Sequence, residues 1–149
     1  MKRIFESGLY KVDIDADDRS VDFEFVPHSR GTIILYARGK GDLDLNLTFK
    51  EGSSWTYLWV NRSNESLNVV ETHILESHVD LRSNYAELSH GNHTKVLRSK
   101  MVGSHTHLKM KGAIIAFNRL IWDLEAHHEA KHTFANMDNH AIVPEDGYI

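Results

Sequence analysis

Residues 42–59 read DLDLNLTFKEGSSWTYLW and contain two runs in which apolar and polar residues alternate. The apolar members are Leu43, Leu45, Leu47 and Phe49 in the first run, and Trp55, Tyr57 and Trp59 in the second. Alternation of this kind predicts β-strands that bury one face. The intervening residues 51–54 contain a glycine and two serines, which is typical of a turn. This stretch therefore predicts two short strands joined by a tight turn.

The same alternation occurs on both sides of this stretch. Val21, Phe23 and Phe25 alternate with polar neighbours before it, as Leu120, Trp122 and Leu124 do after it. Turn-forming clusters separate such runs at intervals of about 12 residues, which is the usual spacing of short strands in all-β domains. We therefore expect residues 1–149 to form a single all-β domain.

Every second turn resembles the others. If the turns are aligned on His28, Ser54, His78, His105 and His132, the spacings are 26, 24, 27 and 27 residues. A repeat of 20–50 residues is typical of stacked architectures. The repeat predicts a parallel β-helix of about five two-strand coils, each ~4.8 Å above the last. A β-sandwich or jelly roll is the alternative.

The composition excludes several classes of site. Hydrophobic residues make up 41% of the chain and charged residues 26%, as in ordinary globular proteins, and the formal net charge is −4. This charge argues against nucleic acid or an anionic membrane as a partner. The chain has no cysteine, which excludes thiolate metal sites made by this chain alone. With no apolar leader and no apolar stretch of about 20 residues, we expect a cytoplasmic protein.

Three stretches in residues 41–143 resemble the SufB/SufD proteins of the SUF iron–sulfur cluster assembly system. They are the stretch that ends at Trp59, DLDLNLTFKEGSSWTYLW; residues 85–94, YAELSHGNHT; and residues 123–143, DLEAHHEAKHTFANMDNHAIV. The resemblance implies a right-handed parallel β-helix, in agreement with the repeat.

For function, the resemblance implies a non-catalytic scaffold subunit. Such a subunit pairs through its solenoid with a second one, giving either a homodimer or a heterodimer with a longer SufB/SufD-type chain, and it works with a SufC-type ATPase. Family members continue into further coils and a C-terminal helical segment that docks the ATPase. The cysteine, acidic and histidine residues proposed to handle clusters in that family have no counterpart here. We therefore expect an accessory role without enzymatic turnover.

One alternative is a zinc-dependent hydrolase. His128-Glu129-Ala130-Lys131-His132 fits the H-E-x-x-H pattern, in which two imidazoles bind zinc and the glutamate acts as general base. The pattern works only on an α-helix, because only there do residues four apart converge. The alternation of the preceding residues favours a strand instead.

A second alternative is a small histidine-rich metal-binding module. If the coils stack, His78, His105 and His132 occupy equivalent positions on successive coils, with imidazoles about 5 Å apart. In this alignment Ser54 fills the gap between His28 and the other three. Neutral imidazole binds transition metals, so these three histidines are the candidate metal ligands, and no other cofactor is expected. His105-Thr106-His107 also resembles the H-x-H of cupins, but no carboxylate follows it within the next five residues.

Overall fold

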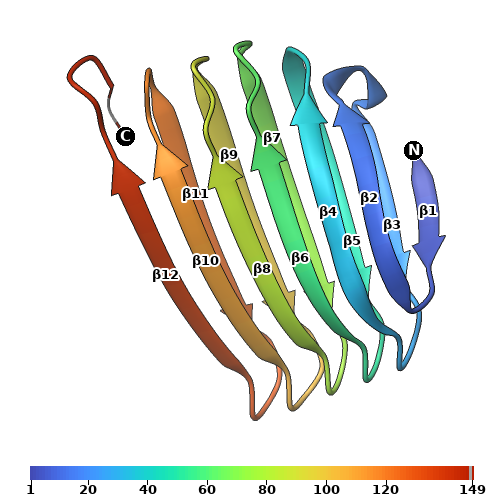
Figure 1. The fold of residues 1–149 in the computed structure, drawn as a ribbon. Coiled ribbons are helices and arrows are strands. Elements are labelled where there is room, and N and C mark those ends of the chain that lie inside the picture. Colours follow the sequence, from blue (N-terminus) through green and yellow to red (C-terminus); the bar gives the residue numbers. More distant parts are fainter. Residues whose placement is uncertain (148) are drawn as a thin grey trace.

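The computed structural model describes residues 1–147 and Ile149, and it consists of parallel β-strands wound into a solenoid (Figure 1). Successive strands alternate between two six-stranded sheets, one in the order β1-β3-β5-β7-β9-β11 and the other in the order β12-β10-β8-β6-β4-β2. The winding gives about five turns. This architecture confirms the predicted parallel β-helix over a sandwich or jelly roll, which are built from antiparallel strands.

The strands have nearly uniform lengths after the first coil. The first sheet contains β1 (Lys2–Phe5), β3 (Ser20–Phe25), β5 (Gly41–Phe49), β7 (Leu67–Leu75), β9 (His93–Met101) and β11 (Leu120–His128). The second sheet contains β2 (Gly8–Asp15), β4 (Arg30–Arg38), β6 (Ser54–Asn61), β8 (Asp80–Glu87), β10 (His107–Ile115) and β12 (Phe134–Ile142). A 3₁₀ turn, Ala16–Asp18, joins β2 to β3. None of the helical segments in the described part of the chain is long and apolar enough to span a membrane.

The core lies between the two sheets and consists of the alternate side chains that point inward. In β6, Trp55, Tyr57 and Trp59 are buried while their sequence neighbours are half-exposed. This burial identifies the aromatic stripe of the sequence as core. The strands pair in register from coil to coil, so like side chains stack along the solenoid axis. Phe5, Phe25 and Phe49 stack in this way, with ring centroids 5.3 and 4.4 Å apart.

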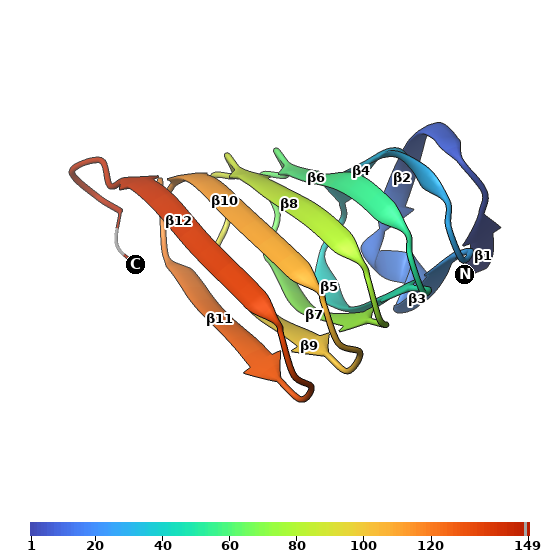
Figure 2. The ribbon, with the colours of Figure 1, turned by 90° about the horizontal axis from the view of Figure 1, so that it is seen from below.

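The interior changes character along the axis. The first coils are filled by aliphatic and aromatic side chains, whereas the middle coils also bury charged groups on β7, β8 and β9. Figure 2 shows the solenoid from below, with β11 and β12 forming one end and β1 the other. Most inward-pointing residues of the last coil, though not Leu120, are only partly covered, because no further coil in the described residues packs on them.

Candidate functional site

The turns from the first sheet to the second lie along one edge of the solenoid, at the bottom in Figure 1. Apart from the short turn between β1 and β2, each contains one residue in the left-handed region, and four of these five residues are histidines. In chain order they are His28 with φ 58°, Gly52 with φ 70°, His78 with φ 60°, His105 with φ 60° and His132 with φ 58°. The amide groups of the first four continue the inter-coil hydrogen bonding, as in the bond from the His78 amide to the Ser104 carbonyl, at 2.9 Å. These residues therefore set the corner of each coil.

Three of these histidines stack on one another as the repeat predicts. The rings of His78 and His105 are 5.0 Å apart and within 5° of parallel, and those of His105 and His132 are 4.9 Å apart at 22°. All three side chains are exposed. We call these residues the histidine stack.

The alignment of the second turn requires a correction. Gly52, not Ser54, fills the position between His28 and His78, because Ser54 pairs with Arg30 and with Asp80 as the first residue of β6. The spacings are thus 24 and then 26 residues, the reverse of the predicted order. A Cβ at Gly52 would collide with the imidazole of His28, which explains the glycine at this turn.

The histidine stack does not direct its nitrogens to a common point. Imidazole lone pairs lie in the ring plane, and the planes of His78 and His105 are nearly parallel and 5.0 Å apart. A zinc ion needs nitrogens about 2.0–2.1 Å away, so one ion cannot bind both rings without a ring rotation. Among the described residues, no group of three or more His, Asp or Glu side chains is arranged to hold a metal ion. Metal binding by His78, His105 and His132 stays a prediction.

The H-E-x-x-H sequence does not lie on a helix. His128 is the last residue of β11, and residues 129–133 form the turn that leads into β12. The Nδ1 of His128 is 2.6 Å from the Thr133 hydroxyl, while His132 belongs to the histidine stack. The zincin arrangement therefore does not form, because the strand alternation of β11 continues up to His128. The H-x-H pair is likewise divided, since His105 lies in a turn and His107 begins β10.

The most unusual group of side chains lies inside the solenoid. Glu71 and His73 point inward from β7, and Lys95 points inward from β9; all three are at most 1% exposed. The Lys95 ammonium is 2.7 Å from Glu71 Oε2, and His73 Nε2 is 2.5 Å from Glu71 Oε1. The hydroxyls of Tyr85 and Tyr57 also donate to Glu71, at 2.9 and 3.3 Å. We call these five residues, together with Glu87, the buried network.

Glu71 is ionised at the centre of this network. Burial alone would raise its pKa, but the charge of Lys95 and the hydrogen bond from His73 outweigh burial and hold the pKa of Glu71 at about 2. Burial lowers the pKa of Lys95, and the charge of Glu71 opposes that shift. The two groups therefore form a buried ion pair in which each stabilises the charge of the other.

Glu87 forms the second half of the network, on β8. Its Oε1 accepts a hydrogen bond of 2.6 Å from the Trp59 indole, and its Oε2 has no hydrogen-bond partner. Burial raises the pKa of Glu87, although the nearby Lys95 charge acts against that rise. Lys95 packs on the Trp59 ring, 3.4 Å from its centroid, as a cation–π contact. The aromatic rings thus seal the ion pair from solvent.

The sequence carries a signal for this network in the alternation of β7. In residues 67–75, LNVVETHIL, Glu71 and His73 share the inward parity of Leu67, Val69 and Leu75. Charged residues are rarely buried unless they are paired, so two ionisable residues on the buried face of a strand indicate partners inside the fold. Counting the parity of every charged residue on each strand would have identified Glu71, His73 and Lys95.

The coil formed by β11 and β12 leaves the solenoid open. Among the described residues, β11 pairs only with β9 and β12 only with β10, so each keeps an unpaired edge. Leu120 is buried, but the other inward-pointing apolar residues packed against the core from this coil are only partly buried, and they are Trp122, Leu124, Ala126, Ala135 and Met137. The indole N–H of Trp122 is buried without an acceptor. We call this surface, with its two edges, the open end.

The opposite end is better covered. β1 has only four residues, and Phe5 is 1% exposed even though it belongs to the first coil. The Arg3 guanidinium lies 4.8 Å from the centroid of the Phe5 ring, and the Tyr10 hydroxyl donates to the Glu6 carbonyl at 2.9 Å. These contacts close the N-terminal end, so the two ends differ in both length and cover.

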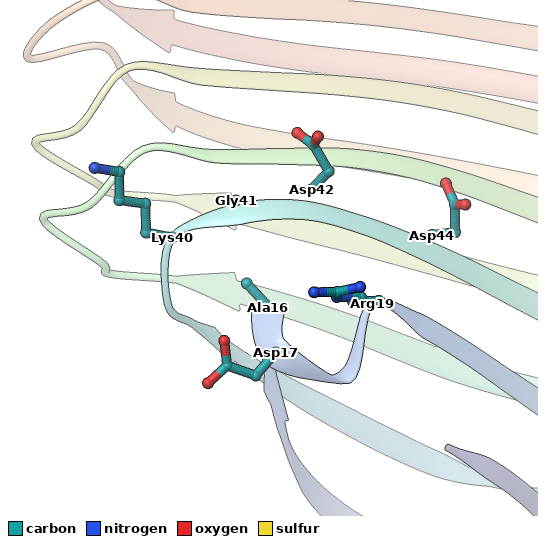
Figure 3. Close-up of a pocket in the computed structure, with 7 residues that line it drawn as sticks. All are labelled: Ala16, Asp17, Arg19, Lys40, Gly41, Asp42 and Asp44. Atoms are coloured by element: carbon teal, nitrogen blue, oxygen red, sulfur yellow. The ribbon is translucent and has the colours of Figure 1, made fainter.

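A surface hollow near the N-terminal turns contains charges of both signs (Figure 3). It is lined by Ala16, Asp17, Arg19, Lys40, Gly41, Asp42 and Asp44. Asp17 and Lys40 point away from the other labelled side chains (Figure 3), and Asp42 already accepts a hydrogen bond of 3.0 Å from Asn68. The hollow therefore does not gather one kind of charge around a common point.

Comparison of the chain with protein-family models, with curated proteins and with solved structures gave no significant match. The resemblance to SufB and SufD thus stays a prediction. The parallel β-helix that it implies is the fold of this structure.

Proposed function

We propose that the protein is a non-catalytic scaffold subunit that associates through its open end. The observation that carries the proposal is the last coil, where Trp122, Leu124 and Met137 point into the core but are only half covered. Unpaired strand edges next to apolar side chains are a template for another chain. Parallel coils bury such edges by packing on a further coil, so a docked partner would supply the missing cover.

The occupant that we propose is a second copy of this chain, packed end to end across a two-fold axis. The open end matches itself, because β11 and β12 are both nine residues long and an isologous contact brings identical strands together. The N-terminal end is a poorer match, since β1 has four residues and Phe5 is already covered. End-to-end pairing closes the assembly, whereas head-to-tail pairing would extend it into a filament.

The resemblance to SufB and SufD supports the same role and suggests its context. Members of that family pair through their solenoids in iron–sulfur cluster assembly. On this proposal the chain takes part in that process as an accessory subunit, with a longer SufB/SufD-type chain as the alternative occupant of the open end. Any association with a SufC-type ATPase would then run through that longer chain.

The test measures the oligomeric state of two matched variants. Sedimentation velocity should show a dimer for the unaltered protein and a monomer for Met137→Lys, because two lysines would face each other in the paired ends. The control is Leu9→Lys, which places the same charge on an exposed residue of β2, 69% accessible, and should leave the dimer intact. Circular dichroism of both variants shows whether the fold is kept.

Two results would overturn the proposed pairing. A monomer of the unaltered protein at high concentration contradicts self-association, and binding of a purified SufB/SufD-type subunit would then assign the open end to that partner. A dimer that survives Met137→Lys but not Leu9→Lys would place the interface at the other end.

A further inference from the structure

Several charged side chains on the outer faces of the sheets have a complementary partner in an adjacent coil. Arg98 lies 3.4 Å from Glu125, its partner in register on β11. Asn46 donates to Asp22 at 3.0 Å, again in register, on β5 and β3. In-register pairing places the side chains of adjacent coils directly opposite each other. Complementary partners at these positions avoid the repulsion that like charges would cause.

The outer face of the second sheet contains the opposite arrangement, in which like charges are neighbours. Arg82 on β8 and Lys109 on β10 are partners in register, so two cations lie side by side. Lys111 is two residues further along β10 and points to the same face. All three side chains are exposed, and in residues 1–147 no carboxylate forms an ion pair with any of them. We call them the cationic triad.

Two acidic residues are neighbours of the cationic triad in the sheet, and neither forms an ion pair with it. Asp138 is in register with Lys111, but its carboxylate lies 3.3 Å from His140. Asp80 is in register with His107, two residues from Arg82, and no ion pair forms between Asp80 and Arg82. Like charges directly opposite each other in a sheet are destabilising, so the repulsion between Arg82 and Lys109 lowers the stability of the fold.

The spacing of the triad matches one small anion. Adjacent strands are about 4.8 Å apart, and residues two apart in a strand are separated by about 6.6 Å, so the three flexible side chains can reach a common point. With Thr56 and Asn84 they line a single hollow on the sheet. A hydroxyl and a carboxamide in that hollow can add neutral hydrogen bonds to those of the cations.

We propose that the cationic triad is a binding site for a small phosphate anion, either inorganic phosphate or pyrophosphate. A dianion would relieve the repulsion between Arg82 and Lys109 and accept charge-assisted hydrogen bonds from both. Three cations fit one phosphate better than an extended polyanion, and the net charge of −4 opposes binding of nucleic acid. The site lies on the outer face and is separate from the open end, so the two proposals can fail independently.

The experiment titrates inorganic phosphate and pyrophosphate into the chain of residues 1–149 at low salt, and isothermal titration calorimetry measures the binding. We expect saturable binding that weakens as the salt concentration rises. Arg82→Gln and Lys109→Gln should each weaken it about tenfold or more, because each removes a charge-assisted hydrogen bond. The matched control is Lys100→Gln on the outer face of β9, which should leave the affinity unchanged.

Thermal unfolding provides a second readout that does not depend on the heat of binding. In phosphate-free buffer at low salt, Lys109→Gln should unfold at the same or a higher temperature than the unaltered protein, because the repulsion is gone. In the presence of phosphate the unaltered protein should unfold at a higher temperature than Lys109→Gln, because only the unaltered protein gains stability from the ligand.

Equal and non-saturable binding by all four proteins would overturn the proposal, as would an effect of Lys100→Gln equal to that of Lys109→Gln. Binding of a short oligonucleotide but not of phosphate or pyrophosphate would also overturn it, and would assign the triad to nucleic acid instead.

Discussion

Lys95 reaches into the solenoid with its ammonium 2.7 Å from Glu71, and both residues are almost wholly inaccessible to solvent. Because neither charge can return to water without unfolding, we expect Lys95→Met to destabilise the protein by about 3–5 kcal/mol. The double variant Glu71→Gln/Lys95→Met removes both charges and should recover much of that loss. Urea unfolding of the three proteins measures the difference, and equal losses in the single and double variants would contradict a buried ion pair.

The low pKa of Glu71 makes the protein sensitive to acid. Its folded pKa is about 2 against an ordinary value of 4.5, so between these values the unfolded chain binds more protons than the folded one. The stability that Glu71 contributes is fully present above about pH 4.5 and is lost as the pH falls toward 2. The shift corresponds to about 3 kcal/mol. Urea midpoints at pH 6, 4 and 3 check this, and Glu71→Gln/Lys95→Met should flatten the profile.

Glu87 has the opposite dependence. Burial raises its pKa, so the folded state holds the proton of Glu87 more tightly than the unfolded chain does. The contribution of Glu87 to stability is therefore present below its ordinary pKa of 4.5 and is lost as the pH rises through its folded pKa. Glu87→Gln, which keeps an acceptor for the Trp59 indole, should raise the thermal midpoint at pH 7 and change it little at pH 4. A lower midpoint at pH 7 would contradict this reasoning.

At the scale of single elements, the turns depend on residues in the left-handed region. Glycine occupies that region freely, whereas a residue with a Cβ is strained there by about 1–2 kcal/mol. His105 has φ 60° and is stacked on both sides, which offsets part of that strain. We expect His105→Ala to be less stable than His105→Gly by about 1 kcal/mol, measured by urea unfolding. Equal stability of the two variants would show that the backbone strain is relieved elsewhere.

The same variants test metal binding by the histidine stack. If His78, His105 and His132 bind a transition metal, a titration with zinc or nickel ions should show saturable binding by the unaltered protein and none by His105→Gly. The parallel rings argue for weak binding, since each ion could reach only one ring without a rearrangement.

The strands could be predicted from the sequence because one face of each is buried, so the alternation of Leu43, Leu45 and Leu47 is enforced by the core. The stacking of His78, His105 and His132 followed from their equal spacing of 27 residues. The second turn was misplaced because Ser54 resembles the neighbouring turns in sequence, whereas the left-handed corner needs Gly52. Local similarity did not reveal which residue takes the strained conformation.

The buried network could not be derived from residue type alone. Glu71, Lys95 and Glu87 come from three different strands, and their burial is possible only because each meets a partner distant in sequence. Similarly, H-E-x-x-H is compatible with a helix on its own, and the pairing of β11 with β9 decides that it begins in a strand.

At the scale of the whole molecule, the coils differ in how well they are covered. The middle coils have a neighbour on each side, whereas β11 and β12 each pair with one strand. Hydrogen exchange should therefore be slowest in β5–β8 and fastest in β11 and β12. If the protein dimerises through the open end, exchange in β11 and β12 should slow as the protein concentration rises, while exchange in β1 should not. Mass spectrometry at two concentrations measures both, and a concentration effect at β1 alone would place the contact at the other end.

The way the Phe5, Phe25 and Phe49 rings repeat inside the solenoid has a consequence for how the chain acquires its shape. Because each coil packs on matching side chains of its neighbour, we expect folded structure to propagate along the axis from one coil to the next. The surface made by β11 and β12 is the place where a further coil would pack. A molecule that binds there must present what another coil of the same chain would present: extended backbone in register, with side chains that fit Trp122 and Leu124.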